Sequence, residues 1–319
     1  MKNLERVYIR LPNWIGDVCM SRPAVQAAAA SGLNVVACGK PWAQALLADL
    51  PNLQFVPLSG HWREDRQRIK AHRRSHPCAG RSVGLLLPDS LTSALAFRLA
   101  GLPCAGYRDD GRSLLLRWPF AKARDPMHAV QSWYWLTREA FAQWGYTLAP
   151  QAADNLFLDS QAPAMAAAQT ALSEAGVQDT PVLIAPTATG QHKGKSKVWP
   201  HFDSLTRQLQ SQGYTVVMSP PHHEVAQAKA NAPSATVIPP LDLAAFVALL
   251  RQCRLVICND SGVAHLAALT KTPQLTLIGV TNPARTRPWT SHAQLLGRYG
   301  HWPSAADVLE AAKPLLRND

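Results

Sequence analysis

Long apolar runs are missing from this sequence of 319 residues. A membrane-spanning helix needs about 20 consecutive apolar residues, and the most apolar segment, 83–102, is interrupted by Pro88, Asp89 and Arg98. The first residues, MKNLERVYIRL, lead directly into a strand-like pattern and show no secretory signal. We therefore expect a cytoplasmic protein without a transmembrane helix.

Paired cysteines are absent as well. The six cysteines are scattered, and none forms the C-x-x-C spacing that is typical of zinc or redox sites. Four of them lie in apolar runs, where a reduced thiol packs as a small hydrophobic group: Cys19, Cys38, Cys253 and Cys258. This pattern fits a reducing cytoplasm and does not fit a zinc site.

Two motifs with known chemistry are missing. No G-x-G-x-x-G follows the first strand of either half, which argues against a dinucleotide oxidoreductase. The G-x-S-x-G elbow of a serine hydrolase is absent too, so Asp260, Ser261 and His265 do not indicate a catalytic triad, although they are close in sequence. A non-catalytic module that binds a sugar or nucleotide remains an alternative to an enzyme.

Acidic residues are outnumbered, with 21 Asp and Glu against 32 Lys and Arg, a net charge of +11. Such a balance favours an anionic partner: nucleic acid, an anionic membrane surface or a phosphorylated substrate. Between residues 61 and 81, seven basic side chains face only two acidic ones. Aromatic residues are not interleaved with them beyond Trp62, which argues against stacking on nucleic acid. The alternative interpretation is a solvated helix face.

The sequence does contain a regular alternation of apolar strand patterns and amphipathic helix patterns. This alternation predicts parallel sheets covered by helices. Periodicity is lost at 146–163, so we expect two α/β domains, 1–155 and 156–319, with a cleft between them. Strands are expected at 6–11, 33–38, 53–57, 83–87, 104–107, 182–186, 214–218, 235–238, 255–258 and 274–278, and helices at 20–31, 40–49, 63–75, 90–100, 127–145, 164–175, 200–212, 222–231, 242–252, 262–270 and 304–316.

The most informative turn follows the apolar run at 255–258. Asn-Asp-Ser-Gly ends this predicted strand, and a helix pattern rich in small residues follows. A helix N-terminus presents free backbone N–H groups and a positive dipole end, which together bind phosphate. Gly262 allows a ligand to approach the backbone, and Asp260 or Ser261 can either cap the helix or bond the ligand.

A second turn of the same layout lies near the start of the chain. The strand pattern at 6–11 is followed by the turn 12–17 and then by a helix pattern. Asp17 therefore lies at the mouth of the first β–α loop, where open α/β sheets place their ligands. A helix-capping role for Asp17 is the alternative interpretation.

Four blocks of the sequence, taken together, resemble glycosyltransferase family 9, the bacterial heptosyltransferases. They are LPNWIGDVCMSRPAV (11–25), LLLPDSLTSALAFRLAGLPCAGY (85–107), KVWPHFDSLTRQLQSQGYTVV (197–217) and CNDSGVAHLAALTKTPQLTLIGVTNPARTRPW (258–289). The NWIGD and PDS..SAL forms are most similar to heptosyltransferase II of the lipopolysaccharide inner core.

The resemblance implies a GT-B fold of two Rossmann-like domains with parallel sheets facing a cleft, an N-terminal half for the acceptor and a C-terminal half for the nucleotide-sugar. The last helix of this fold often crosses back to the first domain. The implied reaction is the inverting transfer of heptose from ADP-heptose to the lipopolysaccharide inner core, without a cofactor or a metal. The implied location is the cytoplasm, at the inner face of the bacterial inner membrane. Other sugars or acceptor positions within the family remain alternatives.

The resemblance also implies catalytic roles for two residues. Asp17 matches the family aspartate that acts as general base, and Lys197 matches the lysine of a Lys-x-Trp-Pro motif that reaches the diphosphate. Because Lys193 and Lys195 are close to Lys197 in the sequence, it stays open which of the three lysines has this role. The alternative interpretation is that all three belong to a flexible basic loop.

Donor and acceptor residues follow from the same resemblance and from their places after predicted strands. We expect nucleotide-sugar contacts from Thr187, Thr189, Glu224, Asp260, Ser261, Gly262 and His265. A buried neutral histidine is the alternative for His265. We expect the anionic lipopolysaccharide acceptor, rather than nucleic acid, to meet Asp89, Ser90, Ser93, Arg63, Arg66, Arg73 and Arg74, because arginine forms charge-assisted bonds with carboxylates and phosphates.

Overall fold

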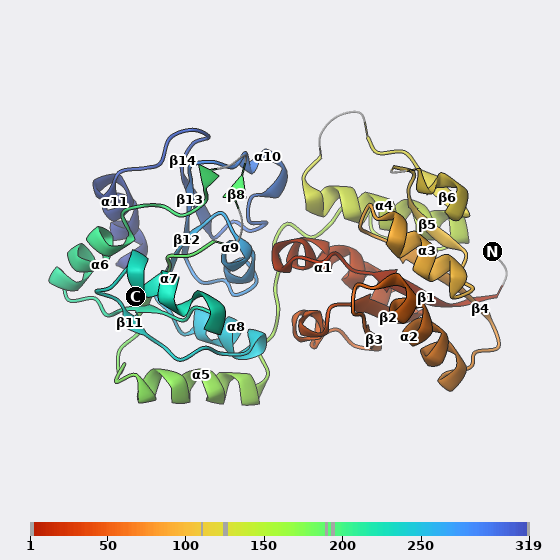
Figure 1. Cartoon of the computed structure of the whole chain (residues 1–319), viewed down its shortest axis with the longest axis horizontal. Coiled ribbons are helices and arrows are strands. Elements are labelled where there is room, and N and C mark those ends of the chain that lie inside the picture. The colour runs from red at the N-terminus through yellow and green to blue at the C-terminus, as the bar shows by residue number, and fades with distance from the viewer. Residues whose placement is uncertain (1–2, 110, 124–126, 189–190, 193–194, 318–319) are drawn as a thin grey trace. The chain divides into compact units, whose positions relative to one another are not determined.

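The computed structural model describes residues 3–109, 111–123, 127–188, 191–192 and 195–317. The chain divides into two compact units, Met1–Ala153 and Asp154–Asp319 (Figure 1). The division falls two residues before the boundary expected from the sequence. The described strands of each unit form a six-stranded parallel sheet, and a two-residue hairpin, β8 (Gln191–His192) with β9 (Lys195–Ser196), accompanies the second sheet.

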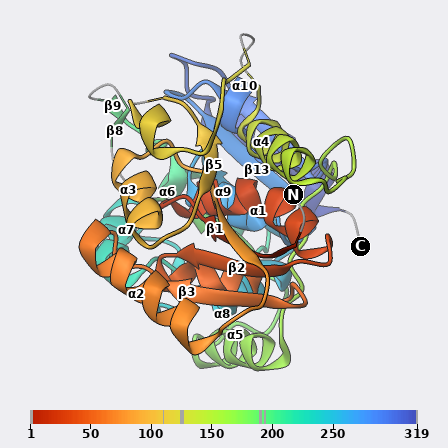
Figure 2. The ribbon, with the colours of Figure 1, turned by 90° about the vertical axis from the view of Figure 1, so that its right-hand side faces the viewer.

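The sheet of the first unit has the order β3-β2-β1-β4-β5-β6. Its strands are β1 (Leu4–Arg10), β2 (Asn34–Gly39), β3 (Leu53–Pro57), β4 (Arg81–Leu86), β5 (Cys104–Tyr107) and β6 (Trp118–Phe120). Helices α1 (Ile15–Ala29) and α4 (Ala129–Trp144) pack together on one face, and α2 (Trp62–Ser75) and α3 (Leu91–Leu99) on the other (Figure 2). The 3₁₀ helices η1 (Pro41–Leu47) and η2 (Arg112–Leu115) complete the unit.

Both faces of this sheet are buried, which explains why its strands read as continuous apolar runs. Along β1, Tyr8 packs into the cluster beneath α2 and α3, together with Ile69 and Phe97. Its neighbours Val7 and Ile9 are equally buried and project to the opposite face, because successive strand side chains alternate. The core therefore fixes the position of the loops at both ends of the strands.

The second unit repeats this plan with the order β11-β10-β7-β12-β13-β14. Its strands are β7 (Val182–Ala185), β10 (Val216–Met218), β11 (Thr236–Val237), β12 (Leu255–Asn259), β13 (Gln274–Ile278) and β14 (Ala293–Gly297). Its helices are α5 (Ala162–Glu174), α6 (Phe202–Ser211), η3 (His222–Glu224), α7 (Val225–Asn231), α8 (Leu243–Arg251), α9 (Gly262–Ala267), α10 (Pro283–Thr286) and α11 (Ala305–Leu316).

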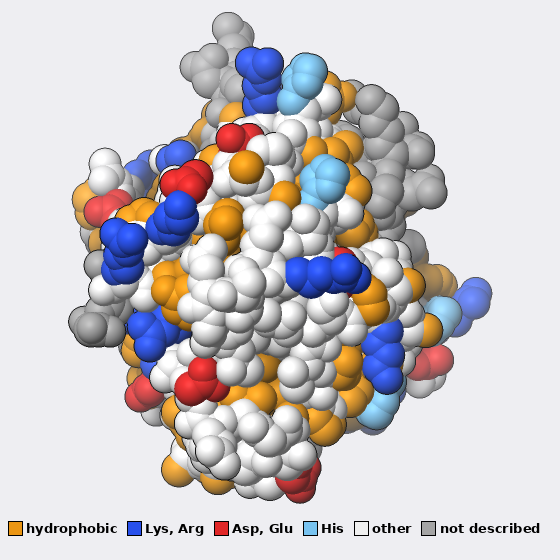
Figure 3. Space-filling view, turned by 90° about the vertical axis from the view of Figure 1, so that its left-hand side faces the viewer, with side chains coloured by type: hydrophobic (Ala, Val, Ile, Leu, Met, Phe, Trp, Pro, Cys, Tyr) orange, Lys and Arg blue, Asp and Glu red, His pale blue; other side chains and the backbone are white. Residues whose placement is uncertain are grey.

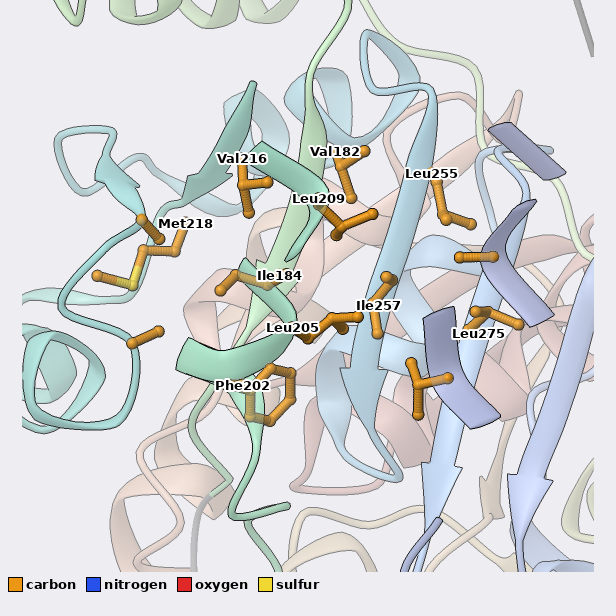
Figure 4. Packing of buried hydrophobic residues seen from close by; sticks show 14 of the residues in the cluster. Val182, Ile184, Phe202, Leu205, Leu209, Val216, Met218, Leu255, Ile257 and Leu275 are labelled. Carbon is orange, nitrogen blue, oxygen red and sulfur yellow. The ribbon is translucent and has the colours of Figure 1, made fainter. Parts of the chain in front are cut away.

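One hydrophobic cluster joins this second sheet to α6 and α11 (Figure 4). Phe202, Leu205 and Leu209 of α6 lie over Ile184 and Ile257 of the central strands. From α11, the cluster includes Val308, Ala312 and Leu316. The last helix thus packs on the core of its own unit, and the expectation that it crosses back to the first domain stays a prediction.

Several elements differ from their predicted form. The expected helix at 40–49 is the 3₁₀ helix η1, and strands β6 and β14 and the β8–β9 hairpin were not predicted. Helix α1 begins at Ile15 rather than near residue 20, so Asp17 lies in its first turn instead of before it. Within the described residues, no helix combines the length and apolarity that crossing a bilayer requires.

Each sheet has one point where the strand order reverses direction. In the first unit this point lies between β1 and β4, and in the second between β7 and β12. Open α/β sheets bind ligands outside the carboxyl ends of the strands at such a switch point. The residues that follow β1, β4, β7 and β12 are therefore the first places to look for a site.

Candidate functional site

A buried amide organises the switch point of the second unit. Asn259 ends β12 and is fully buried. Its Nδ2 donates to the carbonyls of Ala185 and Thr187, each at 3.2 Å, and its Oδ1 accepts from the backbone N–H of Trp199 at 2.9 Å. One side chain therefore holds the exit of β7 and the segment that carries Lys197. Asn259 was not predicted from the sequence, because a polar residue at the end of an apolar strand looks like the start of a turn.

Lys197 lies two residues before a firmly anchored tryptophan. The Trp199 ring is buried, and its Nε1 donates to the Pro303 carbonyl at 2.8 Å. Lys197 itself is partly exposed and interacts electrostatically with Asp260. Lys193 lies outside the described residues, and only the backbone of Lys195 is described, in β9. The anchored position therefore belongs to Lys197, while the choice among the three lysines stays a prediction.

Asp260 follows Asn259, and three effects act on the pKa of its carboxyl group. Burial raises the pKa of its carboxyl, while a hydrogen bond from Thr281 and the positive charge of Lys197 oppose that rise. The net pKa stays above the usual value. Thr281 follows β13 and was not predicted as a site residue. Asp260 thus lies between a hydroxyl and an ammonium group at the carboxyl edge of the sheet.

The Asp-Ser-Gly turn does not use its side chains as caps. Ser261 occupies the N-cap position of α9, but its hydroxyl makes no capping bond and has no hydrogen-bond partner among the described residues. Gly262 is the first residue of this helix, and His265 in the same helix is buried, with only 5% of its surface exposed. The Ser261 hydroxyl is therefore buried without a hydrogen-bond partner among the described residues, and His265 fits the alternative interpretation of a buried histidine.

Thr187 and Glu224 form the third part of this edge. The hydroxyl of Thr187, two residues past β7, donates to Glu224 Oε2 at 2.5 Å. Glu224 ends η3, which follows β10, and His223 Nε2 lies 3.6 Å from its other oxygen. The structure thus brings together two predicted donor residues that are 37 positions apart. Thr189, the other threonine predicted here, lies outside the described residues.

In the first unit, Asp17 occupies the first turn of α1, three residues after the N-cap residue Trp14. Its carboxyl group is half-buried and has no hydrogen bond or ion pair within the described part of the chain, and burial raises its pKa. The helix start has no side-chain cap, so the capping interpretation of Asp17 is not supported. Next to it, Trp14 is 68% exposed, which is unusual for so large an apolar side chain.

A buried arginine holds the loop that leads to Asp17. Arg10, the last residue of β1, is almost fully buried and donates to Asn13 Oδ1 at 2.7 Å and to the carbonyl of Leu11. The buried carboxylate of Asp65 on α2 attracts it electrostatically. Asp65 also accepts a bond from the Ser59 amide at 2.8 Å. Neither Arg10 nor Asp65 was predicted from the sequence, because each lies inside a regular element.

Asp89, Ser90 and Ser93 lie at the same edge, after β4, and serve local structure. Asp89 forms a 2.8 Å ion pair with the buried Arg112 and a second pair with Lys122. Ser90 caps α3 by accepting from the Ser93 amide at 3.2 Å, and Ser93 is buried. These contacts give the three residues a structural role, and their acceptor role stays a prediction.

The four predicted acceptor arginines do not share one site. Arg63 lies over the Trp62 ring in the first turn of α2, and Arg66 Nε donates to the Leu99 carbonyl at 3.3 Å. Because α2 connects parallel strands β3 and β4, it runs from the carboxyl edge to the amino edge of the sheet. Arg73 and Arg74 in its last turn therefore lie at the edge opposite Asp17. These two arginines therefore do not lie beside Asp17, and the acceptor role of the four arginines stays a prediction.

The described residues include no group of three or more His, Cys, Asp or Glu side chains that could hold a metal ion. Asp109, which the sequence places in a basic loop, is paired with Lys122 at 2.6 Å. At the two switch points, the side chains of Lys197 and Arg10 supply positive charge.

Comparison with known proteins agrees with this geometry. The lipooligosaccharide heptosyltransferase 2 of Haemophilus influenzae is 27% identical over 310 residues, which cover 89% of this chain and 86% of that protein. The structure of Escherichia coli ADP-heptose lipopolysaccharide heptosyltransferase II superposes with a TM-score of 0.76 at 22% identity, covering 98% of each chain. An Escherichia coli heptosyltransferase solved with ADP gives 0.72 at 20%, covering 97% of this chain and 99% of that one.

These structures confirm the predicted GT-B fold with its two Rossmann-like units. The model of glycosyltransferase family 9 (heptosyltransferase) matches residues 81–311, which is well over half of the chain and includes the segment from Lys197 to His265. The chain belongs to glycosyltransferase family 9.

Proposed function

We propose that this protein is an inverting transferase that moves a heptose from ADP-heptose to the inner core of lipopolysaccharide. The names of its relatives support the donor and the acceptor, since they include ADP-heptose and lipopolysaccharide heptosyltransferases. The observation that carries the proposal is Asp17, a half-buried carboxylate with a raised pKa and no described partner at a switch point. An unpaired carboxylate in such a position is expected to act on a ligand.

Asp17 acts as the general base. Transfer requires that the attacking hydroxyl of the acceptor loses its proton as the new glycosidic bond forms. Burial disfavours the charged form of a carboxyl group, so its raised pKa makes the carboxylate a stronger proton acceptor. Direct attack from the face opposite the leaving group inverts the anomeric configuration, and a single base is sufficient for that route.

Lys197 and the Asp260–Ser261 turn stabilise the departing diphosphate. The lysine contributes a point charge, and the unpartnered Ser261 hydroxyl contributes a hydrogen bond. Asp260, bonded by Thr281, orients the ammonium group of Lys197 and accepts bonds from the sugar hydroxyls. Fixed charges and dipoles of this kind lower the barrier because they need no reorganisation during the reaction.

The Thr187–Glu224 pair contacts the nucleoside. Rossmann-like units use an acidic residue beyond the second strand to bond the ribose hydroxyls. Glu224 follows β10, which is the second strand of the six-stranded sheet in chain order, and the bond from Thr187 fixes one of its oxygens. The adenosine ribose therefore lies near Glu224, while the diphosphate lies near the turn after β12.

The acceptor sugar meets Trp14 and the start of α2. An exposed tryptophan beside the base can stack on a sugar ring, and Arg63 and Arg66 supply positive charge for an anionic saccharide. The protein works in the cytoplasm at the inner face of the inner membrane, where it contacts the lipid-linked acceptor peripherally. The reaction proceeds without a metal or another cofactor.

The test is the Asp17→Asn variant, assayed with ADP-heptose and heptose-acceptor core saccharides of defined truncation. Removal of a general base is expected to lower kcat by about 10²–10⁴, with ADP binding retained. Exposed Glu174→Gln on α5 is the matched control for loss of a carboxylate. Proton NMR of the product reports the anomeric configuration. Retained turnover in Asp17→Asn, or retention of configuration, contradicts the proposal.

A further inference from the structure

A large basic cavity lies at the amino edge of the first sheet, opposite Asp17. Its volume is about 1090 Å³, and its lining comes from the starts of β1, β4 and β6 and the ends of α2 and α4. None of the residues that the structure shows lining it is acidic. Six of them carry positive charge: Arg6, Lys70, Arg73, Arg74, Arg81 and Arg117.

The base of this cavity is a buried arginine without a matched counter-ion. Arg6 is only 6% exposed, it donates to the carbonyl of His76, and its Nε has no hydrogen-bond partner among the described residues. Arginine cannot lose its charge in a protein. A buried charge without a full set of partners is costly, so an anion in the cavity would relieve that cost.

The groups packed around Arg6 do not neutralise it. Tyr8 Oη lies 3.0 Å from His72 Nδ1, and the rings of His72 and His76 stack at 4.3 Å. Burial, His76 and Arg6 lower the pKa of His72 to about 4, so this imidazole is neutral at pH 7. Glu5, the acidic residue near the rim, accepts the Gly80 amide at 2.6 Å. The positive charge of the cavity therefore belongs to its arginines and lysine.

The arginine forks are partly fixed in place. Arg73 donates to the Ala100 carbonyl at 2.5 Å, and the Arg74 Nε lies 3.4 Å from the Lys70 carbonyl. Arg81 and Arg117 are exposed and have no ion pair in the described part of the chain. By contrast, on the face of the molecule shown in Figure 3 lysine and arginine side chains are scattered among polar and apolar ones. The first unit thus contains a concentrated group of guanidinium donors.

This cavity is separate from the proposed transfer site. Strand β1 spans seven residues, which corresponds to roughly 20 Å between its two ends. A ligand among Arg6, Arg81 and Arg117 therefore cannot touch an atom that Asp17 acts on. Its role is binding or docking rather than chemistry.

We propose that this cavity binds an anion with two or more phosphate groups. Guanidinium forks match phosphate oxygens in bidentate pairs, and six positive charges call for several negative ones. The volume is at the upper end of small-molecule sites, larger than a single phosphate needs. The ligand is either a free polyphosphate or the phosphorylated headgroup of a lipid, and both present the same chemistry to these arginines.

Cys78 provides a probe inside the cavity. It is a lining residue and half-buried, whereas the other five cysteines of the chain are all buried. Modification of Cys78 by a neutral disulfide, 4,4′-dithiodipyridine, is expected to slow when tripolyphosphate fills the cavity. The Cys78→Ser variant shows which part of the reaction with this disulfide comes from Cys78. Binding of tripolyphosphate near Lys197 in the second unit does not affect this readout.

The variant that tests the proposal is Arg74→Ala/Arg81→Ala/Arg117→Ala, which removes three exposed charges from the cavity. We expect it to raise the half-protecting tripolyphosphate concentration by about tenfold or more, because charge-assisted bonds are lost. The matched control, Arg68→Ala/Arg98→Ala/Arg138→Ala, removes three charges of the same unit outside the cavity and should change it less than about twofold. Calorimetry on the same variants gives a second readout that does not depend on the thiol.

Vesicles distinguish the two sources of phosphate. If tripolyphosphate protects Cys78 in the wild type but not in the cavity variant, the ligand is assigned as a free anion. Protection of Cys78 and co-sedimentation with vesicles that contain cardiolipin, whose headgroup carries two phosphates, but not with phosphatidylcholine vesicles, assigns a lipid headgroup if the cavity variant alone loses both. The proposal is overturned if neither probe protects Cys78 or gives binding heat, or if the cavity and control variants lose binding equally.

Discussion

At the scale of single residues, Asp17 and Lys197 differ in how the fold treats their charge. Asp17 is half-buried with no described partner, so the protein disfavours its ionised form. Lys197 has the carboxylate of Asp260 nearby, and that carboxylate is itself held by Thr281. The carboxylate of Asp17 is thus left without a partner among the described residues, whereas the ammonium group of Lys197 has a carboxylate nearby.

The raised pKa of Asp17 predicts both a pH profile and a stability effect. If Asp17 is the general base, as proposed, turnover needs its carboxylate, and kcat/KM should fall as the pH drops through this raised pKa, at a higher pH than an ordinary aspartate would cause. Since the folded pKa lies above the unfolded one, ionisation of Asp17 lowers stability once the pH exceeds the unfolded value. We therefore expect Asp17→Asn to keep or raise Tm at pH 7 while it loses activity.

Two measurements check this prediction: the pH dependence of kcat/KM for the wild type, and the melting of Asp17→Asn at pH 4 and pH 7. The stabilisation should be larger at pH 7 than at pH 4. A clear fall in Tm at pH 7 would show instead that the carboxylate supports the fold.

Lys197→Ala should weaken ADP binding more than it weakens the fold. Loss of a hydrogen bond to a charged group costs about 1.5–3 kcal/mol, and the lysine is only partly buried. Titration of ADP into single alanine variants of Lys193, Lys195 and Lys197 measures the effect. If all three variants lose affinity equally, no single lysine has the assigned role.

At the scale of elements, Asn259 links three segments by one amide, the end of β12, the exit of β7 and the Lys197 segment. Asn259→Ala leaves the buried Trp199 amide and two carbonyls without these partners. We expect a loss of about 1–3 kcal/mol in unfolding free energy and weaker ADP binding, because Lys197 loses its anchor.

Asn231→Ala is the matched control, since Asn231 also donates to the exit of β7, at the Pro186 carbonyl, but does not reach the Lys197 segment. Denaturant melts and ADP titrations of both variants measure the difference. A loss of ADP affinity as large in Asn231→Ala as in Asn259→Ala would mean that the amide of Asn259 does not position Lys197.

The elements also show what the sequence could predict. The turn at Asp260 was predictable because an apolar strand ends at Asn-Asp-Ser-Gly. The separation of Arg63 from Arg74 was not, since a cluster of charges in sequence has no direction until the helix is placed. Eleven residues of helix correspond to roughly 16 Å, enough to reach the other edge of the sheet. For α11, the amphipathic pattern predicts a helix but does not say which core its Val308 enters.

At the scale of the whole molecule, the two units share one plan and contribute different chemistry. Each sheet places its proposed site residues at a reversal of strand order, and strand order follows from which helices connect which strands. Alternation along the sequence was sufficient to predict this plan. It could not predict that Arg6, Arg81 and Arg117, distant in sequence, line one cavity, because only the parallel register of the sheet brings the amino ends of β1, β4 and β6 to the same edge.

The charge of the whole chain also bears on metal dependence. A net charge of +11, together with Lys197 and the Ser261 hydroxyl at one edge, provides positive and hydrogen-bonding groups for the leaving diphosphate. Such groups can stabilise developing phosphate charge directly, so we expect that a divalent ion is not needed to neutralise it. We expect turnover to persist after exhaustive EDTA treatment and to change less than about threefold when Mg²⁺ or Mn²⁺ is returned, since screening alone shifts charged contacts modestly. Calcium serves as the control for a general ionic effect. Activity that disappears with EDTA and returns only with Mg²⁺ or Mn²⁺ would show that a metal, rather than Lys197, stabilises the departing diphosphate.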